Sequence, residues 1–87
     1  MSFETISVIG LGYIGLPTAA MFAAYGKNVI GVDVNQHAVD TINRGEIHIV
    51  EPDLDAIVHK AVSDGKLKAV LTPEVADAFL IAVPTPF

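Results

Sequence analysis

The spacing of three glycines near the start of the chain constrains its fold more than any other feature. Gly10, Gly12 and Gly15 have the G-x-G-x-x-G spacing of a dinucleotide-binding turn, with a β-branched run before them and an apolar segment of helical length after them. A second β-branched run ends at Asp33, near the distance of about 20 residues at which such turns are followed by a ribose-binding acid. This order of strand, glycine turn, helix, strand and acid predicts a dinucleotide site.

Glycine is needed at each of the three positions of the turn for a different physical reason. Gly10 lets the chain turn sharply off the first strand, because a residue without a Cβ adopts backbone angles closed to other residues. Gly12 leaves the backbone bare, so that a pyrophosphate can approach the free N–H groups at the start of the helix. Gly15 lets the helix lie close to the strand. Glycine turns also serve ordinary packing of a helix on a strand, but the surrounding pattern of elements favours the dinucleotide interpretation.

The acid at position 33 predicts which dinucleotide binds. At the carboxyl end of the second strand, the Asp33 carboxylate can accept hydrogen bonds from both ribose hydroxyls of an adenosine, and its charge would repel a 2′-phosphate. No Arg or Lys follows it before Arg44. We therefore expect NAD, rather than NADP, as the cofactor.

The rest of the chain continues to alternate between helices and strands. Pro17, near the end of the first helical turn, is expected to loosen that turn. Apolar runs, helical periods and turn residues predict the following elements: a strand over 6–9, a helix over 13–25 with Gly26 as its left-handed stop, a strand over 28–32, a helix from the N-cap Asn35 to Arg44, a partly buried loop over 46–52, a helix over 53–64, a strand over 67–71, a helical turn at 72–74 and a strand over 78–83.

These elements form a single α/β domain over residues 1–87. With right-handed connections, the strands take the order 3-2-1-4 in a parallel sheet flanked by helices, which is part of a Rossmann fold. The order changes direction between the first and fourth strands, so Pro84 and Thr85 are expected to border the ligand crevice. The fourth strand lies at an edge of the sheet and carries neither charge nor proline in its middle. We therefore expect a homodimer or a higher homo-oligomer.

Composition excludes several other classes of function. The net charge is −5 and the five basic residues are scattered, which argues against nucleic acid as a partner. The most apolar stretch is interrupted and too short to span a bilayer, so we expect no membrane segment and a cytoplasmic location. No cysteine is present to form a disulfide or a thiolate metal site. Glu51, Asp53 and Asp55 resemble a metal cluster on paper, but a solvated first helical turn explains them better, so no metal is expected.

Four short segments together resemble the N-terminal part of the UDP-glucose/GDP-mannose dehydrogenase family. They are Ile-Gly-Leu-Gly-Tyr-Ile-Gly-Leu-Pro at 9–17, Val-Asp-Val-Asn at 32–35, Glu-Pro-Asp-Leu at 51–54 and Val-Pro-Thr-Pro at 83–86, and the resemblance extends over essentially the whole chain. By motif match, the resemblance implies that NAD contacts Gly10, Gly12, Tyr13, Ile14 and Asp33. It also implies that Pro84 and Thr85 form the loop beside the cofactor.

The resemblance further implies an activity for the enzyme of which such a chain is part. The family oxidises the C6 alcohol of a UDP-sugar or related sugar nucleotide to a carboxylate, in two successive NAD-dependent steps and through a thioester on a cysteine. This chain has no cysteine, so no catalytic residue is assigned in it and we expect the chain alone to be inactive. A regulatory domain that senses a nucleotide without hydride chemistry is the alternative, because it can share the same glycine turn and acid.

Overall fold

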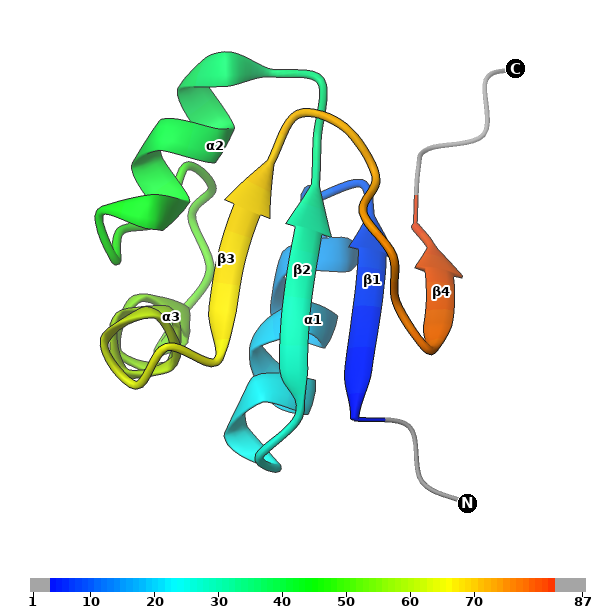
Figure 1. Ribbon diagram of the computed structural model, residues 1–87. Helices are drawn as coiled ribbons and strands as arrows, with labels where there is room; N and C mark the ends of the chain where they lie inside the picture. Colours follow the sequence, from blue (N-terminus) through cyan, green and yellow to red (C-terminus); the bar gives the residue numbers. More distant parts are fainter. Residues whose placement is uncertain (1–3, 83–87) are drawn as a thin grey trace.

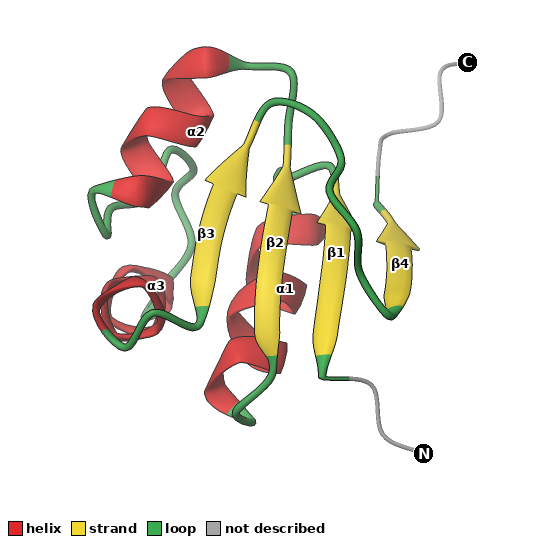
Figure 2. Cartoon of the chain, in the orientation of Figure 1, coloured by secondary structure: helices red, strands yellow, loops and turns green. Residues whose placement is uncertain are grey.

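The computed structural model describes residues 4–82, which fold as four strands and three helices in two layers (Figure 1, Figure 2). Five- and four-residue apolar runs form the strands, and the segments with a helical period form the helices. In chain order the elements are β1 (Thr5–Ile9), α1 (Gly15–Ala24), β2 (Asn28–Val32), α2 (Gln36–Asn43), α3 (Leu54–Ser63), β3 (Leu67–Val70) and β4 (Ala78–Ile81).

The four strands form one parallel sheet in the order β3-β2-β1-β4, which confirms the predicted order. β1 lies in the middle, with Ile6 beside Val29 of β2 and beside Ala78 of β4. The carboxyl ends of β1 and β2 therefore meet at one edge of the sheet, where the glycine turn follows β1 and Asp33 follows β2.

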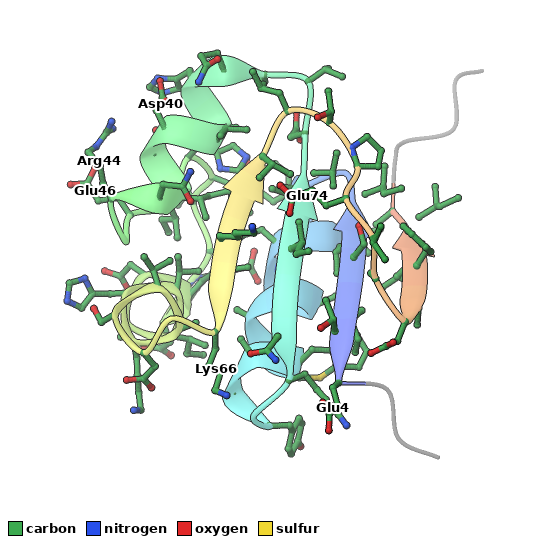
Figure 3. The ribbon with its side chains drawn as sticks, viewed as in Figure 1. Glu4, Asp40, Arg44, Glu46, Lys66 and Glu74 are labelled. Atoms are coloured by element: carbon green, nitrogen blue, oxygen red, sulfur yellow. The ribbon has the colours of Figure 1, made fainter. Side chains whose placement is uncertain are left out.

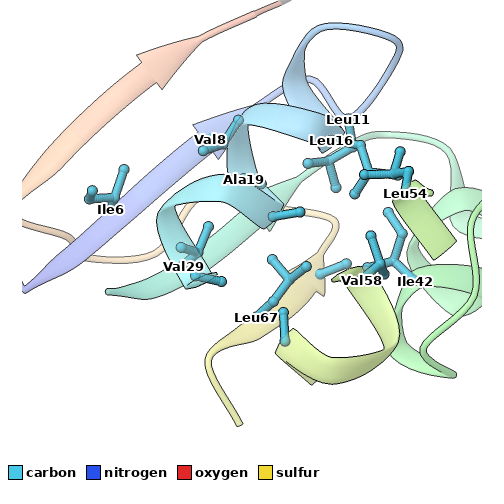
Figure 4. Close-up of a cluster of buried hydrophobic side chains, with 14 of the residues drawn as sticks. Ile6, Val8, Leu11, Leu16, Ala19, Val29, Ile42, Leu54, Val58 and Leu67 are labelled. Atoms are coloured by element: carbon cyan, nitrogen blue, oxygen red, sulfur yellow. The ribbon is translucent and has the colours of Figure 1, made fainter. Parts of the chain in front are cut away.

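The core lies between the sheet and helices α1 and α3 (Figure 4). Slim residues on α1, among them Ala19, Ala20 and Ala23, let the helix approach the strands closely. Val58 of α3 and Ile42 of α2 are completely buried and close the far side of the cluster. The core thus fixes α1 against β1 and β2, which sets the position of the turn that joins them.

The connection from β3 to β4 contains no helix, so the predicted helical turn at 72–74 is wrong. Residues 71–77 instead cross the sheet on the face opposite α1 (Figure 1). A right-handed connection requires that face, because the chain here moves in the opposite direction across the sheet. Glu74, which lies in front of the strands in Figure 3, pairs with Lys68 of β3 at 2.9 Å. Tertiary contacts have therefore overridden the local preference of residues 72–74 for a helical turn, and the segment is extended.

Asp77 fixes the end of this crossover to the start of β1. Its Oδ2 accepts the N–H groups of Glu4 and Thr5 at 3.0 and 2.9 Å, and its own N–H donates to the carbonyl of Thr5. Asp77→Ala should lower the free energy of unfolding by about 1 kcal/mol, because two amides lose a charged acceptor at an exposed site. Chemical denaturation measures the loss. Asp77→Asn keeps an oxygen acceptor and should cost less, and equal losses for the two variants would contradict this role.

Several boundaries differ from the predicted ones. α1 begins at Gly15, two residues later than predicted, because residues 12–14 form a turn. Pro17 therefore lies inside the first turn, where N–H groups have no partner within the helix anyway. The third strand ends at Val70 and the fourth at Ile81, so the predicted strands were longer than the observed ones. Gly26, with a φ of +89°, ends α1 in the left-handed conformation as predicted.

The segment between α2 and α3 is an irregular, partly buried loop, as predicted. Ile47 and Ile49 pack against the core, while Val50 points into solvent. Asp53 then has a left-handed φ of +64° and its side chain makes no capping bond, although a solvated helical turn was predicted there. Within residues 4–82 no acidic or histidine cluster suits a metal ion, and no helix is long and apolar enough to cross a bilayer.

Candidate dinucleotide site

A pocket of about 330 Å³ lies at the carboxyl ends of β1 and β2, where the glycine turn and the acid meet. In parallel α/β sheets, ligands bind outside the carboxyl ends of the strands where the strand order changes direction. Here the change falls at β1, which has β2 on one side and β4 on the other. The pocket is lined by Ile9, Gly10, Leu11, Gly12, Val32, Asp33, Val34 and Ala82.

The first glycine makes the turn possible. Gly10 has a φ of +96°, and its N–H donates to the carbonyl of Val32 on the neighbouring strand at 2.8 Å. A side chain would be strained in that conformation. The chain therefore leaves β1 abruptly and passes over the end of β2.

The third glycine is required by packing. A Cβ at Gly15 would overlap the carbonyl oxygen of Gly10 and would come within 3.4 Å of the Ala82 side chain. The first residue of α1 thus lies directly against the start of the turn. Gly15 acts on the site by holding the helix in place, and its backbone is buried.

The second glycine has no such reason within the described chain. A Cβ at Gly12 would have no protein atom within 4 Å, and its φ is not positive. Neither backbone strain nor packing among residues 4–82 therefore excludes a side chain here. The bare backbone at Gly12 borders the pocket, which is the space that a ligand needs to approach the turn.

The backbone beyond Gly12 offers donors to an anion. Tyr13 and Ile14 are exposed, and within residues 4–82 the N–H groups of residues 12–14 make no hydrogen bond. They precede the N-terminus of α1, whose dipole adds positive potential. Free N–H groups and a helix N-terminus together suit a phosphate group.

Asp33 is fixed at the mouth of the pocket by two backbone amides. Its Oδ2 accepts the N–H of Leu11 in the glycine turn at 3.0 Å, and its Oδ1 accepts the N–H of Asn35 at 2.9 Å. A carboxylate has about four lone-pair sites, so each oxygen keeps capacity for a ribose hydroxyl. Asn35 in turn caps α2, since its side chain accepts the N–H of Ala38.

Leu11 is a residue whose importance sequence reasoning missed. Its side chain is completely buried and lies over Gly31 of β2, where a Cβ would come within 2.8 Å of its methyl groups. This contact fixes the Leu11 backbone so that its N–H meets Asp33. The glycine in the middle of the second strand was the available signal, because a glycine inside a strand often marks a close approach.

The structure thus brings together most of the predicted site residues. Gly10, Gly12 and Asp33 line the pocket, Gly15 lies beneath it, and Tyr13 and Ile14 form the exposed turn beside it. Ala82, just after β4, adds a wall that was not predicted. Pro84 and Thr85 lie outside the described residues.

Comparisons with known proteins find a matching family and several similar dehydrogenases. The family model described as UDP-glucose/GDP-mannose dehydrogenase family, NAD binding domain, matches residues 4–87. UDP-N-acetyl-D-mannosamine dehydrogenase of Yersinia pestis is 77% identical over all of this chain and 21% of its own length. NDP-N-acetyl-D-galactosaminuronic acid dehydrogenase of Ralstonia nicotianae is 70% identical, again over all of this chain and 21% of its own length.

A solved structure shows the same fold. The UDP-N-acetyl-mannosamine dehydrogenase of Staphylococcus aureus superposes with a TM-score of 0.91 at 52% identity, over 94% of this chain and 20% of that one. The chain therefore spans about a fifth of the length of these relatives. Since the family model covers nearly all of it, NAD is the cofactor that the fold implies. The chain belongs to the UDP-glucose/GDP-mannose dehydrogenase family and lies within its NAD-binding domain.

Proposed function

We propose that this chain holds NAD for an enzyme that oxidises the C6 alcohol of UDP-N-acetyl-D-mannosamine to a carboxylate. The observation that carries the proposal is the arrangement of Asp33 and the glycine turn. Two backbone amides hold the Asp33 carboxylate beside the turn, and the space next to Gly12, where a side chain would lie, is open. Identity of 77% to a UDP-N-acetyl-D-mannosamine dehydrogenase supports the choice of substrate.

Each site residue has a proposed role toward NAD. Asp33 accepts the hydroxyls of the adenosine ribose. Gly12, Tyr13 and Ile14 present N–H groups to the pyrophosphate, while Gly10 and Gly15 shape and support the turn. Pro84 and Thr85 follow β4 in sequence, and we assign them to the loop beside the cofactor.

The chemistry requires groups beyond this chain. NAD, when bound, accepts one hydride in each of two oxidations, so the four-electron change from alcohol to carboxylate consumes two molecules, with water supplying the second oxygen. A thioester on a cysteine links the two steps in the family that this chain resembles. The chain has no cysteine, so we assign that nucleophile and the sugar-binding groups to other parts of the enzyme.

The product, UDP-N-acetyl-mannosaminuronate, would supply bacterial surface polysaccharide such as enterobacterial common antigen. We place the reaction in the cytoplasm, where NAD and nucleotide sugars are available together. The acidic net charge of −5 gives no support to a nucleic acid as a partner.

Turnover by the intact enzyme that carries this chain tests the proposal. With UDP-N-acetyl-D-mannosamine, two NADH should form for each uronate, and UDP-N-acetyl-galactosamine should react more slowly. The 87-residue chain alone should bind NAD weakly and form no NADH. Binding of NAD without turnover of either sugar by the intact protein would favour the regulatory alternative and contradict the dehydrogenase.

A further inference from the structure

Gly31 lies in β2, and the Leu11 side chain of the glycine turn occupies the space where a side chain of residue 31 would lie. A Cβ on Gly31 would come within 2.8 Å of both methyl carbons of Leu11 and within 3.3 Å of its Cγ. Carbon atoms pack at about 3.5–4.0 Å, so an alanine here would require Leu11 to move by roughly 1 Å. The φ of Gly31 is not positive, so the need for glycine comes from this contact and not from backbone strain.

The surrounding core holds Leu11 in place. Its side chain is completely buried in the core cluster, where Figure 4 shows it grouped with Leu16 of α1 and Leu54 of α3. Close-packed interiors transmit strain because they contain few voids that could absorb it. A side chain added at Gly31 would therefore push Leu11, and with it the backbone of the turn, away from β2.

The Leu11 backbone carries one of the two amides that hold Asp33. Gly31 and Asp33 are two residues apart, and the Asp33 N–H continues the ladder of β2 by donating to the carbonyl of Val70, so both residues face the same side of the sheet. Leu11 contacts that side twice, through its side chain at Gly31 and through its N–H, 3.0 Å from Oδ2 of Asp33. A hydrogen bond of this length is lost when the donor moves away by about 1 Å. The Asp33 carboxylate would then be held by the Asn35 amide alone.

We propose that Gly31 is a positioning residue for recognition of the adenosine ribose, and that it acts through Leu11 on the Asp33 carboxylate. The inference rests on the proposed function, in which Asp33 accepts the ribose hydroxyls. A binding group is effective when packing and hydrogen bonds from its neighbours lock its geometry. Leu11 provides both for Asp33. The residues that line the pocket do not include Gly31, so its effect on the ligand is indirect.

Titration calorimetry of the intact enzyme that carries this chain tests the inference, with NAD and 2′-deoxy-NAD as the two probes. The second probe lacks the 2′-hydroxyl of the adenosine ribose, so the wild type should bind NAD about 10-fold more tightly or better, the value of a hydrogen bond to a charged group. Gly31→Ala should reduce this preference to about 2-fold or less, because the carboxylate is no longer held in place. A displacement of the turn that did not involve Asp33 would weaken both probes equally and leave the ratio unchanged.

The two probes separate this inference from the proposed function. A wild-type preference that survives in Gly31→Ala would overturn the role of Gly31 and leave the ribose role of Asp33 intact. A wild type that binds both probes equally would remove the ribose role of Asp33, and the role of Gly31 with it.

Two further variants test whether Gly31 acts through Leu11. Leu11→Ala removes the side chain that holds the amide, so it should lose the preference for NAD although Gly31 is unchanged. Leu11→Val combined with Gly31→Ala keeps the total volume, since one methylene is removed and one is added, and should recover most of the preference. A wild-type ratio in Leu11→Ala, or a double variant no better than Gly31→Ala, would refute the route through Leu11.

Val29→Ala is the matched control for a loss of stability. Val29 lies on the same side of β2, two residues before Gly31, and is 2% exposed in the same core cluster, but it does not line the pocket. The cavity left by the smaller side chain should destabilise the fold. The preference for NAD over 2′-deoxy-NAD should nevertheless stay at the wild-type value. Loss of the preference in this variant would show that any weakening of β2 releases Asp33, and the specific role of Gly31 would be wrong.

Discussion

A Gly12→Val variant is expected to fold like the wild type and to show no measurable binding of NAD. The open space around Gly12 and its ordinary φ mean that the chain itself accommodates a side chain there. A branched side chain would instead occupy the volume that the pyrophosphate needs beside the N–H groups of residues 12–14. NMR titration of the chain with NAD, which detects weak binding, measures the loss.

The circular dichroism spectrum of the Gly12→Val variant should match that of the wild type. Ala24→Val is a suitable control, because it adds bulk at an exposed position of the same helix, far from the turn. This control should bind NAD normally. Unchanged binding by Gly12→Val would show that the phosphates do not lie over this turn, and the site would have to be reassigned.

Asp33→Ala should weaken NAD binding by about 1–3 kcal/mol, the range for a lost hydrogen bond to a charged group. That loss corresponds to about 5- to 150-fold in the dissociation constant. The wild type should prefer NAD to NADP, because the carboxylate repels a 2′-phosphate, and the variant should lose most of that preference. Parallel titrations with the two cofactors give both quantities.

Asp40→Ala separates the position of the acid from its charge. It removes one negative charge from an exposed position on α2, where the Asp40 carboxylate accepts a hydrogen bond from the Gln36 side chain. Its affinities for NAD and NADP should stay close to those of the wild type. A wild-type chain that binds both cofactors equally well would remove the ribose role from Asp33.

Local sequence signals predicted the structure correctly where interactions between residues close in sequence determine the conformation. Short β-branched runs predicted the buried parallel strands, and the right-handed rule then predicted their order. Asn35 was expected to cap α2, and its side chain does accept the N–H of Ala38. Gly26 was expected to stop α1 in a left-handed conformation, and its φ is +89°.

The predictions failed where distant residues decide the conformation. Thr72, Pro73 and Glu74 have a local preference for a helical turn, but the crossover is extended and held by Asp77 and the Lys68–Glu74 pair. Asp53 has a left-handed backbone conformation, and no sequence signal indicated it, because the position holds neither glycine nor asparagine. In the site, the glycines and the acid were predictable from their spacing. Which amide binds the acid was not, because it depends on where Leu11 packs.

The bond between Asp33 and the glycine turn has a consequence for redesign of the cofactor preference. Exchanging the acid for a small or basic residue, to admit a 2′-phosphate, would also take the acceptor from the Leu11 N–H. The Leu11 side chain is buried and packs against Gly31, so the turn cannot rotate the Leu11 N–H toward solvent without displacing that side chain. A variant with NADP specificity would therefore need two changes together: a basic side chain that binds the 2′-phosphate, and a new acceptor for the Leu11 N–H of the turn.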